Sequence, residues 1–249
     1  MRRRLLATTF LAVAALHQAA PARTAPAAPP APATPVAARP NILVIVADDL
    51  GYSDIGAFGG EIRTPNLDAL AKRGLRLTGF HSAPTCSPTR SMLLSGTDNH
   101  LAGLGNMAEM LAPNQSGYEG YLPADIVTLA DRLRDLGYAT MMSGKWHLGV
   151  RAEDSPARHG FDQSFDLAQG GGNHFGTDLS QKPGDGGTTY WENGTRVSQL
   201  PAGFYSSDAY AAKLIDQLGR ADRGKPFFAY LTFTAPHWPL QAPAEDIAR

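Results

Sequence analysis

Short runs of the length expected of sheet strands recur along this chain. Residues 42–47 (ILVIVA) are continuously apolar and rich in β-branched side chains, which predicts a strand buried on both faces. Further strands are predicted over residues 75–80, 138–142 and 227–233, of which the last (FFAYLTF) has the strongest pattern.

Between these runs, apolar side chains recur every three or four residues, the period of an amphipathic helix. Helices are predicted over residues 65–74, 125–136 and 206–218. Because strands and helices take turns, the sequence predicts an α/β fold with a mostly parallel sheet sandwiched by helices. Residues 169–187 are rich in glycine with little periodicity, and we expect a long surface loop there.

Polar side chains gather where three of the predicted strands end. Asp48 and Asp49 follow the first strand, Lys145 and His147 follow the strand at 138–142, and the last strand leads into His237. In open α/β sheets, ligands bind outside the carboxyl ends of the strands. The pattern therefore predicts a hydrolase or transferase site at this edge.

Each of these residues also has a simpler interpretation. Two aspartates after a strand can cap the next helix or solvate a turn, and they can equally supply oxygen ligands to calcium or magnesium. His147 alone could be a structural histidine, Lys145 a surface charge and His237 a turn residue. Lys145 and His147 lie between glycines that would let the backbone approach a ligand, which favours the functional interpretation.

Composition narrows the function class. The 249 residues hold 22 Lys and Arg against 23 Asp and Glu, for a net charge of −1, which excludes a basic nucleic-acid-binding protein. The single cysteine, Cys86, excludes an internal disulfide framework. A free cysteine is most often a small buried hydrophobic residue.

The first residues predict export. Arg2, Arg3 and Arg4 precede an apolar run over 5–16, and Ala20-Pro21-Ala22 offers a cleavage site, so residues 1–22 are predicted to be a signal peptide. The run is shorter than the roughly 20 residues that span a bilayer, so no stable membrane span is expected. Residues 23–40 alternate Ala and Pro and predict an extended linker before a domain over 41–249. The protein is expected to be periplasmic or secreted.

The segment around the cysteine reads TCSPTRSMLLSG. This C-x-P-x-R pattern, followed by an apolar helix and Ser-Gly, resembles the signature of type I sulfatases of the alkaline-phosphatase superfamily, whose cysteine is oxidised to Cα-formylglycine. Five further motifs resemble that family in order and spacing: DDLG at 48–51, TPNLD at 64–68, GTDNH at 96–100, GKWHLG at 144–149 and APHWP at 235–239. Within the family, residues 91–110 and 203–210 look most like bacterial arylsulfatases.

The resemblance implies a modified, metal-dependent site. Asp48, Asp49 and the converted Cys86 would bind a divalent cation, which is calcium in the bacterial arylsulfatases. The formylglycine aldehyde would hydrate to a geminal diol, and a separate formylglycine-generating enzyme would have to produce it. The helix predicted to begin near Pro88 would direct its free N–H groups towards the modified residue.

The resemblance also implies how the ester is cleaved. Arg90 would orient the diol, while Lys145 and His237 would hold the oxygens of a small-molecule sulfate ester. One diol hydroxyl would attack sulfur and expel the phenol, giving a covalent sulfo-enzyme intermediate. His147 would then deprotonate the second hydroxyl, so that sulfate leaves and the aldehyde returns.

The sequence departs from the family pattern in one respect. The family has a second metal-binding pair, Asp-Asn, and another sulfate-binding lysine well after the position of His237, and this sequence has neither. The resemblance therefore implies the N-terminal portion of a sulfatase, truncated at the C-terminus, whose sheet would expose an edge and an apolar face. Three functions remain open: an arylsulfatase, a phosphate or phosphonate ester hydrolase of the same superfamily, and an inactive remnant.

Overall fold

A computed structural model describes residues 39–110, 112, 114–181 and 185–248. The predicted signal peptide, residues 1–22, lies outside the described residues, as does nearly all of the predicted linker. Within the described ranges, every helix is too short or too polar to cross a lipid bilayer.

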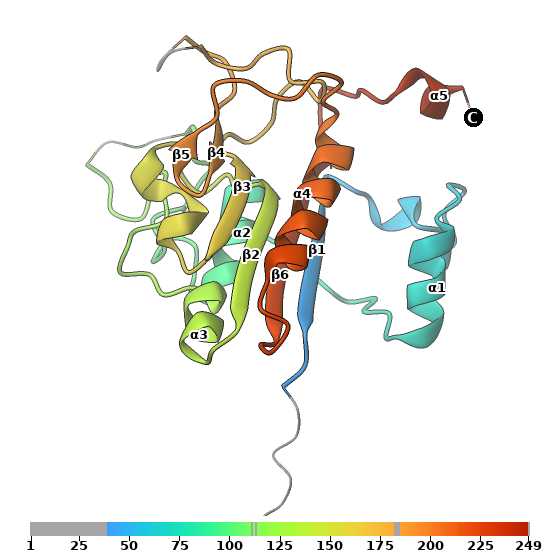
Figure 1. Cartoon of the computed structure of the whole chain (residues 1–249), viewed down its shortest axis with the longest axis horizontal. Helices are drawn as coiled ribbons and strands as arrows, with labels where there is room; N and C mark the ends of the chain where they lie inside the picture. Colours follow the sequence, from blue (N-terminus) through green and yellow to red (C-terminus); the bar gives the residue numbers. More distant parts are fainter. Residues whose placement is uncertain (1–38, 111, 113, 182–184, 249) are drawn as a thin grey trace, which may run out of the picture. The chain divides into compact units, whose positions relative to one another are not determined.

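Within the part of the chain that the structure describes, six strands form one sheet in the order β1-β6-β2-β3-β4-β5 (Figure 1). Strands β1, β6, β2 and β3 are parallel to one another, whereas β4 and β5 continue the sheet in antiparallel pairs. The strands are β1 (Ile42–Asp48), β2 (Ala139–Lys145), β3 (Gln163–Leu167), β4 (Tyr190–Glu192), β5 (Thr195–Arg196) and β6 (Phe227–Pro236). The predicted α/β class with a mostly parallel sheet is confirmed.

Helices cover the sheet on both faces. On one face, α2 (Cys86–Ser95) and α3 (Leu129–Asp135) contribute Leu94 and Leu133 to a core that includes Phe228 and Tyr230 of β6. On the other face, α4 (Ser206–Arg220) packs its Tyr210 and Leu214 against β2, β3 and β6. Two shorter or more exposed helices, α1 (Pro65–Arg73) and α5 (Ala244–Ile247), bury none of their side chains.

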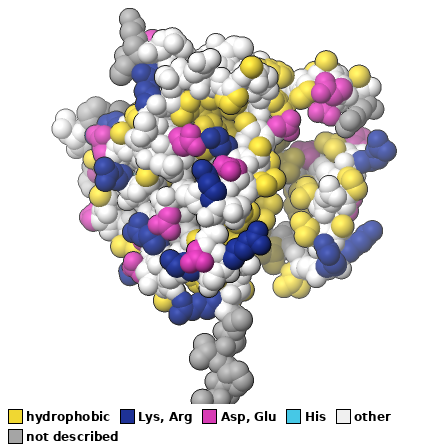
Figure 2. All heavy atoms as spheres, viewed as in Figure 1, with side chains coloured by type: hydrophobic (Ala, Val, Ile, Leu, Met, Phe, Trp, Pro, Cys, Tyr) yellow, Lys and Arg dark blue, Asp and Glu magenta, His cyan; other side chains and the backbone are white. Residues whose placement is uncertain are grey.

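Strand β1 lies at the edge of the sheet, and the described residues cover only one of its faces. Ile42, Val44 and Val46 pack on the α2–α3 side, but Leu43 and Ile45 are 51% and 50% exposed. The prediction that this strand is buried on both faces is therefore wrong, because α4 covers β2 and β6 and stops short of β1. Figure 2 shows hydrophobic side chains gathered along this side, over β1 and α4. The expected open edge and apolar face are present.

The predicted strand over 75–80 is absent. These residues form no ladder, and Leu75 is 91% exposed. The apolar side chains of Leu75, Leu77 and Phe80 are not sufficient, since a strand exists only where a neighbouring strand accepts its backbone hydrogen bonds. By contrast, β3, β4 and β5 were not predicted from the sequence, because they are short and interrupted by polar side chains.

Other boundaries shift for identifiable reasons. Helix α3 begins at Leu129 rather than at residue 125 because Thr128 caps it: Thr128 Oγ1 accepts the Asp131 N–H at 3.1 Å, and Asp131 Oδ2 accepts the Thr128 N–H at 3.0 Å. Helix α2 begins at Cys86, two residues before the predicted start. The predicted loop over 169–187 contains no helix or strand among its described residues.

Candidate active site

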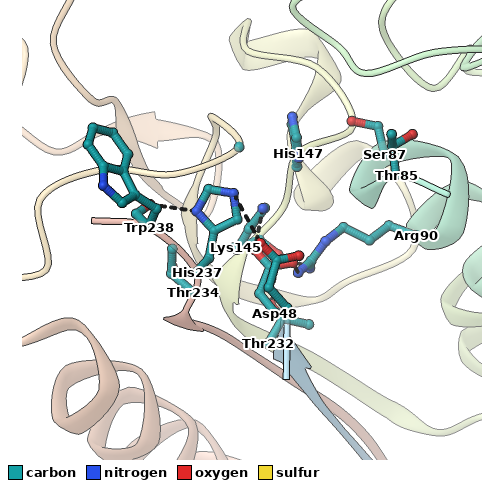
Figure 3. A network of polar contacts seen from close by, with 12 residues as sticks. Asp48, Thr85, Ser87, Arg90, Lys145, His147, Thr232, Thr234, His237 and Trp238 are labelled. Atoms are coloured by element: carbon teal, nitrogen blue, oxygen red, sulfur yellow. Dashed lines mark hydrogen bonds and ion pairs between the residues drawn. The ribbon is translucent and has the colours of Figure 1, made fainter. Parts of the chain in front are cut away.

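The carboxyl ends of three adjacent strands bring the predicted polar residues together. Asp48 is the last residue of β1, Lys145 is the last residue of β2, and His237 directly follows β6, which lies between them. Lys145 was expected to follow its strand, but β2 extends three residues further than predicted and includes it. Figure 3 shows Arg90 reaching the same point from α2 while His237 approaches from the opposite side.

Asp48 is a buried carboxylate held between two cations. Lys145 Nζ donates a hydrogen bond to Asp48 Oδ2, and Arg90 Nη2 lies 3.3 Å from Asp48 Oδ1. Asp48 is 5% exposed, Arg90 2% and Lys145 0%. Burial acts to raise the pKa of the Asp48 carboxyl, but the charges of Arg90 and Lys145 outweigh it and the pKa is lowered. The carboxylate is therefore ionised at neutral pH.

The backbone of Lys145 anchors this cluster. Its carbonyl accepts hydrogen bonds from Arg90 Nη1 at 2.9 Å and from Thr232 Oγ1 at 2.7 Å. Gly144 has a φ of 122°, and a Cβ there would lie 1.8 Å from the Thr232 carbonyl oxygen. The glycines of the GKWHLG motif were expected to admit a ligand. At Gly144 the close approach is instead to the neighbouring strand, which lets β2 reach β6 beside the site.

Cys86 is the first residue of α2 and is partly buried. One ligand atom from each of Asp48, Cys86 and His237 lies within 4.8 Å of the other two. Burial raises the pKa of the thiol, and the charge of Lys145 only partly opposes it. An unmodified Cys86 is therefore a protonated thiol at neutral pH, a weaker nucleophile than a thiolate.

His237 and Asp49 form the outer side of the site. His237 Nε2 lies 3.8 Å from Asp49 Oδ2, and Asp49 has a left-handed φ of 63°. The glycine-rich loop passes over the ring, because a Cβ at Gly171 would lie 3.1 Å from His237. Buried His174 places its Nε2 3.3 Å from the His237 carbonyl and its Nδ1 2.7 Å from Ser206 Oγ.

His147 lies above this cluster in Figure 3 and is 2% exposed. Its φ is 58°, and its Nε2 lies 2.7 Å from Glu109 Oε2. Sequence reasoning missed Glu109, together with Thr232 and His174. Glu109 lies in an irregular segment without periodicity, and no sequence signal distinguishes it from the other surface carboxylates.

Comparison with known proteins places this arrangement in a family. The sulfatase family model matches residues 40–249. The chain belongs to the sulfatase family. It is 46% identical over 213 residues to an arylsulfatase of Klebsiella aerogenes, covering 85% of this chain and 46% of that protein. It is 52% identical over 220 residues to an uncharacterized sulfatase of Schizosaccharomyces pombe, covering 84% of this chain and 40% of that one.

Solved structures agree on the fold of this sulfatase. The crystal structure of Ps i-CgsB superposes with a TM-score of 0.71 at 35% identity, covering 84% of this chain and 48% of the other. A second structure of that protein, in complex with k-i-k-neocarrahexaose, gives a TM-score of 0.67 at 32% identity. The chain spans less than half the length of these relatives.

The site has the chemistry to bind the divalent cation that the family implies. Asp48 and Asp49 offer carboxylate oxygens, the ligands that calcium and magnesium prefer, and the ligand atoms of Asp48, Cys86 and His237 converge. Calcium takes 6–8 oxygen ligands, so these residues supply part of a coordination shell. The carboxylates of Asp48 and Asp49 fit a hard cation in kind, whereas the Cys86 thiol and the His237 imidazole are softer ligands, and the set is incomplete in number.

Proposed function

We propose that this sulfatase acts as an arylsulfatase, hydrolysing an aryl sulfate ester to a phenol and inorganic sulfate. The observation that supports this most strongly is the convergence of Cys86, Asp48 and His237 beside two buried cations at the ends of β1, β6 and β2. The 46% identity to an arylsulfatase supports the choice of leaving group.

The proposal includes two groups that other molecules supply. Converted to formylglycine by a maturation enzyme, Cys86 would provide the hydroxyl nucleophile, and a divalent cation held by Asp48 and Asp49, calcium first, would provide Lewis acidity. Asp48, Asp49, Arg90 and Lys145 together carry no net charge. A bound divalent cation would make the cluster positive, as an anionic sulfate ester requires.

Residues of the chain itself would stabilise the ester and transfer the proton. Lys145 and Arg90 would supply positive charge to the sulfuryl oxygens. Both side chains are shielded from water, which would strengthen their effect. His237, whose side chain is 25% exposed, would donate a hydrogen bond to the ester at the outer side of the site. His147 would accept a proton as general base.

Turnover of matched chromogenic esters tests the reaction. The protein is produced together with a formylglycine-generating enzyme, conversion of Cys86 is verified by intact mass, and 4-nitrophenyl sulfate is compared with 4-nitrophenyl phosphate. We expect multiple turnovers of the sulfate by the converted protein and none by Cys86→Ala. Preference for the phosphate would indicate the phosphoesterase alternative. No turnover of either ester by fully converted protein would contradict the proposal and leave the inactive remnant.

Cys86→Ser separates the mechanism from the reaction. A serine has one hydroxyl where the hydrated aldehyde has two, so it can accept a sulfuryl group but cannot release it by the same route. We expect at most one turnover, with a mass increase on the protein. Steady turnover by Cys86→Ser would refute the assigned role of position 86.

A carbohydrate sulfate ester is a second candidate substrate. It is favoured by the relative of 32% identity whose structure holds a neocarrahexaose. Assaying sulfate release from sulfated oligosaccharides beside the aryl ester, and comparing kcat/KM, would distinguish the two substrate classes.

Cation binding has its own readout. A cation that binds only the folded state at about 100 times its Kd stabilises that state by about 2.7 kcal/mol. We expect calcium to raise the Tm of the protein and Asp48→Asn to abolish the rise. An unchanged Tm across millimolar calcium would contradict the metal assignment.

We also propose that the protein is exported to the periplasm or secreted, with residues 1–22 removed. The Arg-led apolar start of the chain supports this. Intact mass of the protein from cell fractions tests it: a mature form beginning at residue 23 outside the cytoplasm is expected, and a full-length cytoplasmic form would contradict it.

A further inference from the structure

Glu109 and His147 form a pair that the sequence motifs do not reveal. Glu109 Oε2 lies 2.7 Å from His147 Nε2, and Glu109 Oε1 accepts the Gly170 N–H at 3.0 Å. The loop backbone closes directly on the ring, since a Cβ at Gly170 would lie 2.4 Å from His147 Cε1. Both oxygens of Glu109 are thus engaged, and the imidazole is held in one orientation.

The protonation states of the pair follow from their surroundings. Burial lowers the pKa of His147, and the opposing influence of Glu109 does not overcome it. Burial acts to raise the pKa of Glu109, but the hydrogen bond and charge of His147 outweigh it and lower the pKa to about 2. Near neutral pH, Glu109 is therefore a carboxylate facing a neutral imidazole.

A carboxylate can only accept hydrogen bonds. The ring nitrogen that faces it, His147 Nε2, must therefore carry the proton, which leaves the lone pair on Nδ1. Among the described residues, His147 Nδ1 is buried and has no hydrogen-bond partner. The nitrogen that could take a proton from a bound molecule is thus the one that the protein leaves free.

We propose that Glu109 is a positioning residue that fixes His147 as the Nε2–H tautomer and so keeps Nδ1 as the proton acceptor. The inference rests on the proposed role of His147 as general base. In that step a hydroxyl proton moves to Nδ1, and the resulting imidazolium keeps its Nε2–H bond to Glu109, whose negative charge stabilises it. No electrons are transferred to or from the pair.

The wild-type protein gives the first test. Multiple-bond hydrogen–nitrogen NMR correlations of the His147 ring should show a protonated Nε2 and an unprotonated Nδ1 at neutral pH. A proton on Nδ1 in the wild-type protein would overturn the proposal, whatever the activity. This measurement needs no variant, so it decides even if substitutions at position 109 prevent folding.

Glu109→Gln gives a sharper test. The Gly170 N–H still needs an acceptor, so the amide oxygen should take the place of Oε1 and the amide NH₂ should face His147 Nε2. The ring must then accept at Nε2, and the proton should move to Nδ1. Glu119→Gln is the matched control, because Glu119 Oε1 likewise accepts a glycine N–H, that of Gly117 at 3.1 Å. The control should leave the His147 tautomer unchanged.

Kinetics connect the tautomer to the reaction. With the general base in the wrong tautomer, release of sulfate from the covalent intermediate should slow by about 100-fold or more, because proton transfer by a positioned base contributes roughly 10²–10⁴. Because this is the second step, kcat and KM should fall together while kcat/KM stays unchanged. Glu119→Gln should match the wild type. If Glu109→Gln retains both the wild-type tautomer and the wild-type kcat, the proposal is wrong. An Nε2–H tautomer in a protein that never hydrolyses sulfate would support the pair and contradict the proposed function.

Discussion

Removing the ammonium group of Lys145 should destabilise the fold strongly. Lys145→Met keeps most of the side-chain stem but leaves the buried Asp48 carboxylate with Arg90 as its remaining partner, at 3.3 Å. Breaking a buried ion pair by removing one partner costs roughly 3–5 kcal/mol. Since Arg90 stays in place, we expect a loss of about 3 kcal/mol, the lower end of that range.

A lysine–carboxylate ion pair at the surface provides a control for the buried one. Lys213 Nζ lies 2.7 Å from Glu192 Oε1, but these side chains are 32% and 40% exposed. Exposed pairs contribute about 0–1 kcal/mol, so Lys213→Met should cost no more than about 1 kcal/mol. The same substitution at two lysines thus separates the effect of burial from that of losing a charge.

Urea unfolding in the presence of a chelator measures both variants without interference from bound cations. The difference in unfolding free energy between Lys145→Met and Lys213→Met should be about 2 kcal/mol. Combining Lys145→Met with Asp48→Asn should lower the unfolding free energy by less than the sum of the single changes. Asp48→Asn removes the buried negative charge that Lys145→Met leaves without its lysine partner. If Lys145→Met lowered the unfolding free energy by no more than Lys213→Met, the conclusion that the buried Asp48 carboxylate needs both cations for its stability would be refuted.

Two further predictions concern buried positions near the sheet. Burial raises the pKa of the Asp166 carboxyl well above its usual value, so its stabilising contribution is present below the unfolded pKa and is lost as pH rises towards the folded pKa. Asp166→Asn should therefore gain stability relative to the wild type by about 1.4 kcal/mol per pH unit in that window. Curves of unfolding free energy against pH that run parallel for the two proteins would contradict this. Gly144→Ala should cost roughly 3 kcal/mol through its clash with Thr232, whereas Gly219→Ala in α4, where nothing lies within 4 Å of the added Cβ, should be neutral or stabilising in the same thermal unfolding assay.

Sequence alone was sufficient where the signal is local. The apolar runs of β2 and β6 and the amphipathic period of α4 identified these elements, and the polar residues at the strand ends indicated the site. The strand over 75–80 failed because strand formation depends on a partner elsewhere in the chain. Strand β3 was missed for the opposite reason: the polar Ser164 and Asp166 mask a segment that pairs with β2 and β4.

Glu109 shows the limit of motif-based reasoning about the site. It lies 38 residues before His147 in the sequence, in a segment with neither helix nor strand, and it contacts both the histidine and the backbone N–H of the loop at Gly170. No pattern in the residues around Glu109 predicts its contact with His147. Residues carried by strand ends are placed by the sheet, whereas a residue carried by a loop is placed by packing that no local pattern records.

The register of the sheet and the charge arrangement of the site depend on each other. Asp48 and Lys145 are 97 residues apart and meet because β1 and β2 both pair with β6, with Gly144 opposite Thr232. A slip of one residue in β2 would turn every side chain to the opposite face, removing Lys145 from Asp48 and placing a side chain where only Gly144 fits. The buried ion pair therefore penalises the wrong register as well as holding Lys145 in the site. Loss of stability in Lys145→Met would accordingly report on two residues that the proposed reaction uses, Asp48 and Lys145.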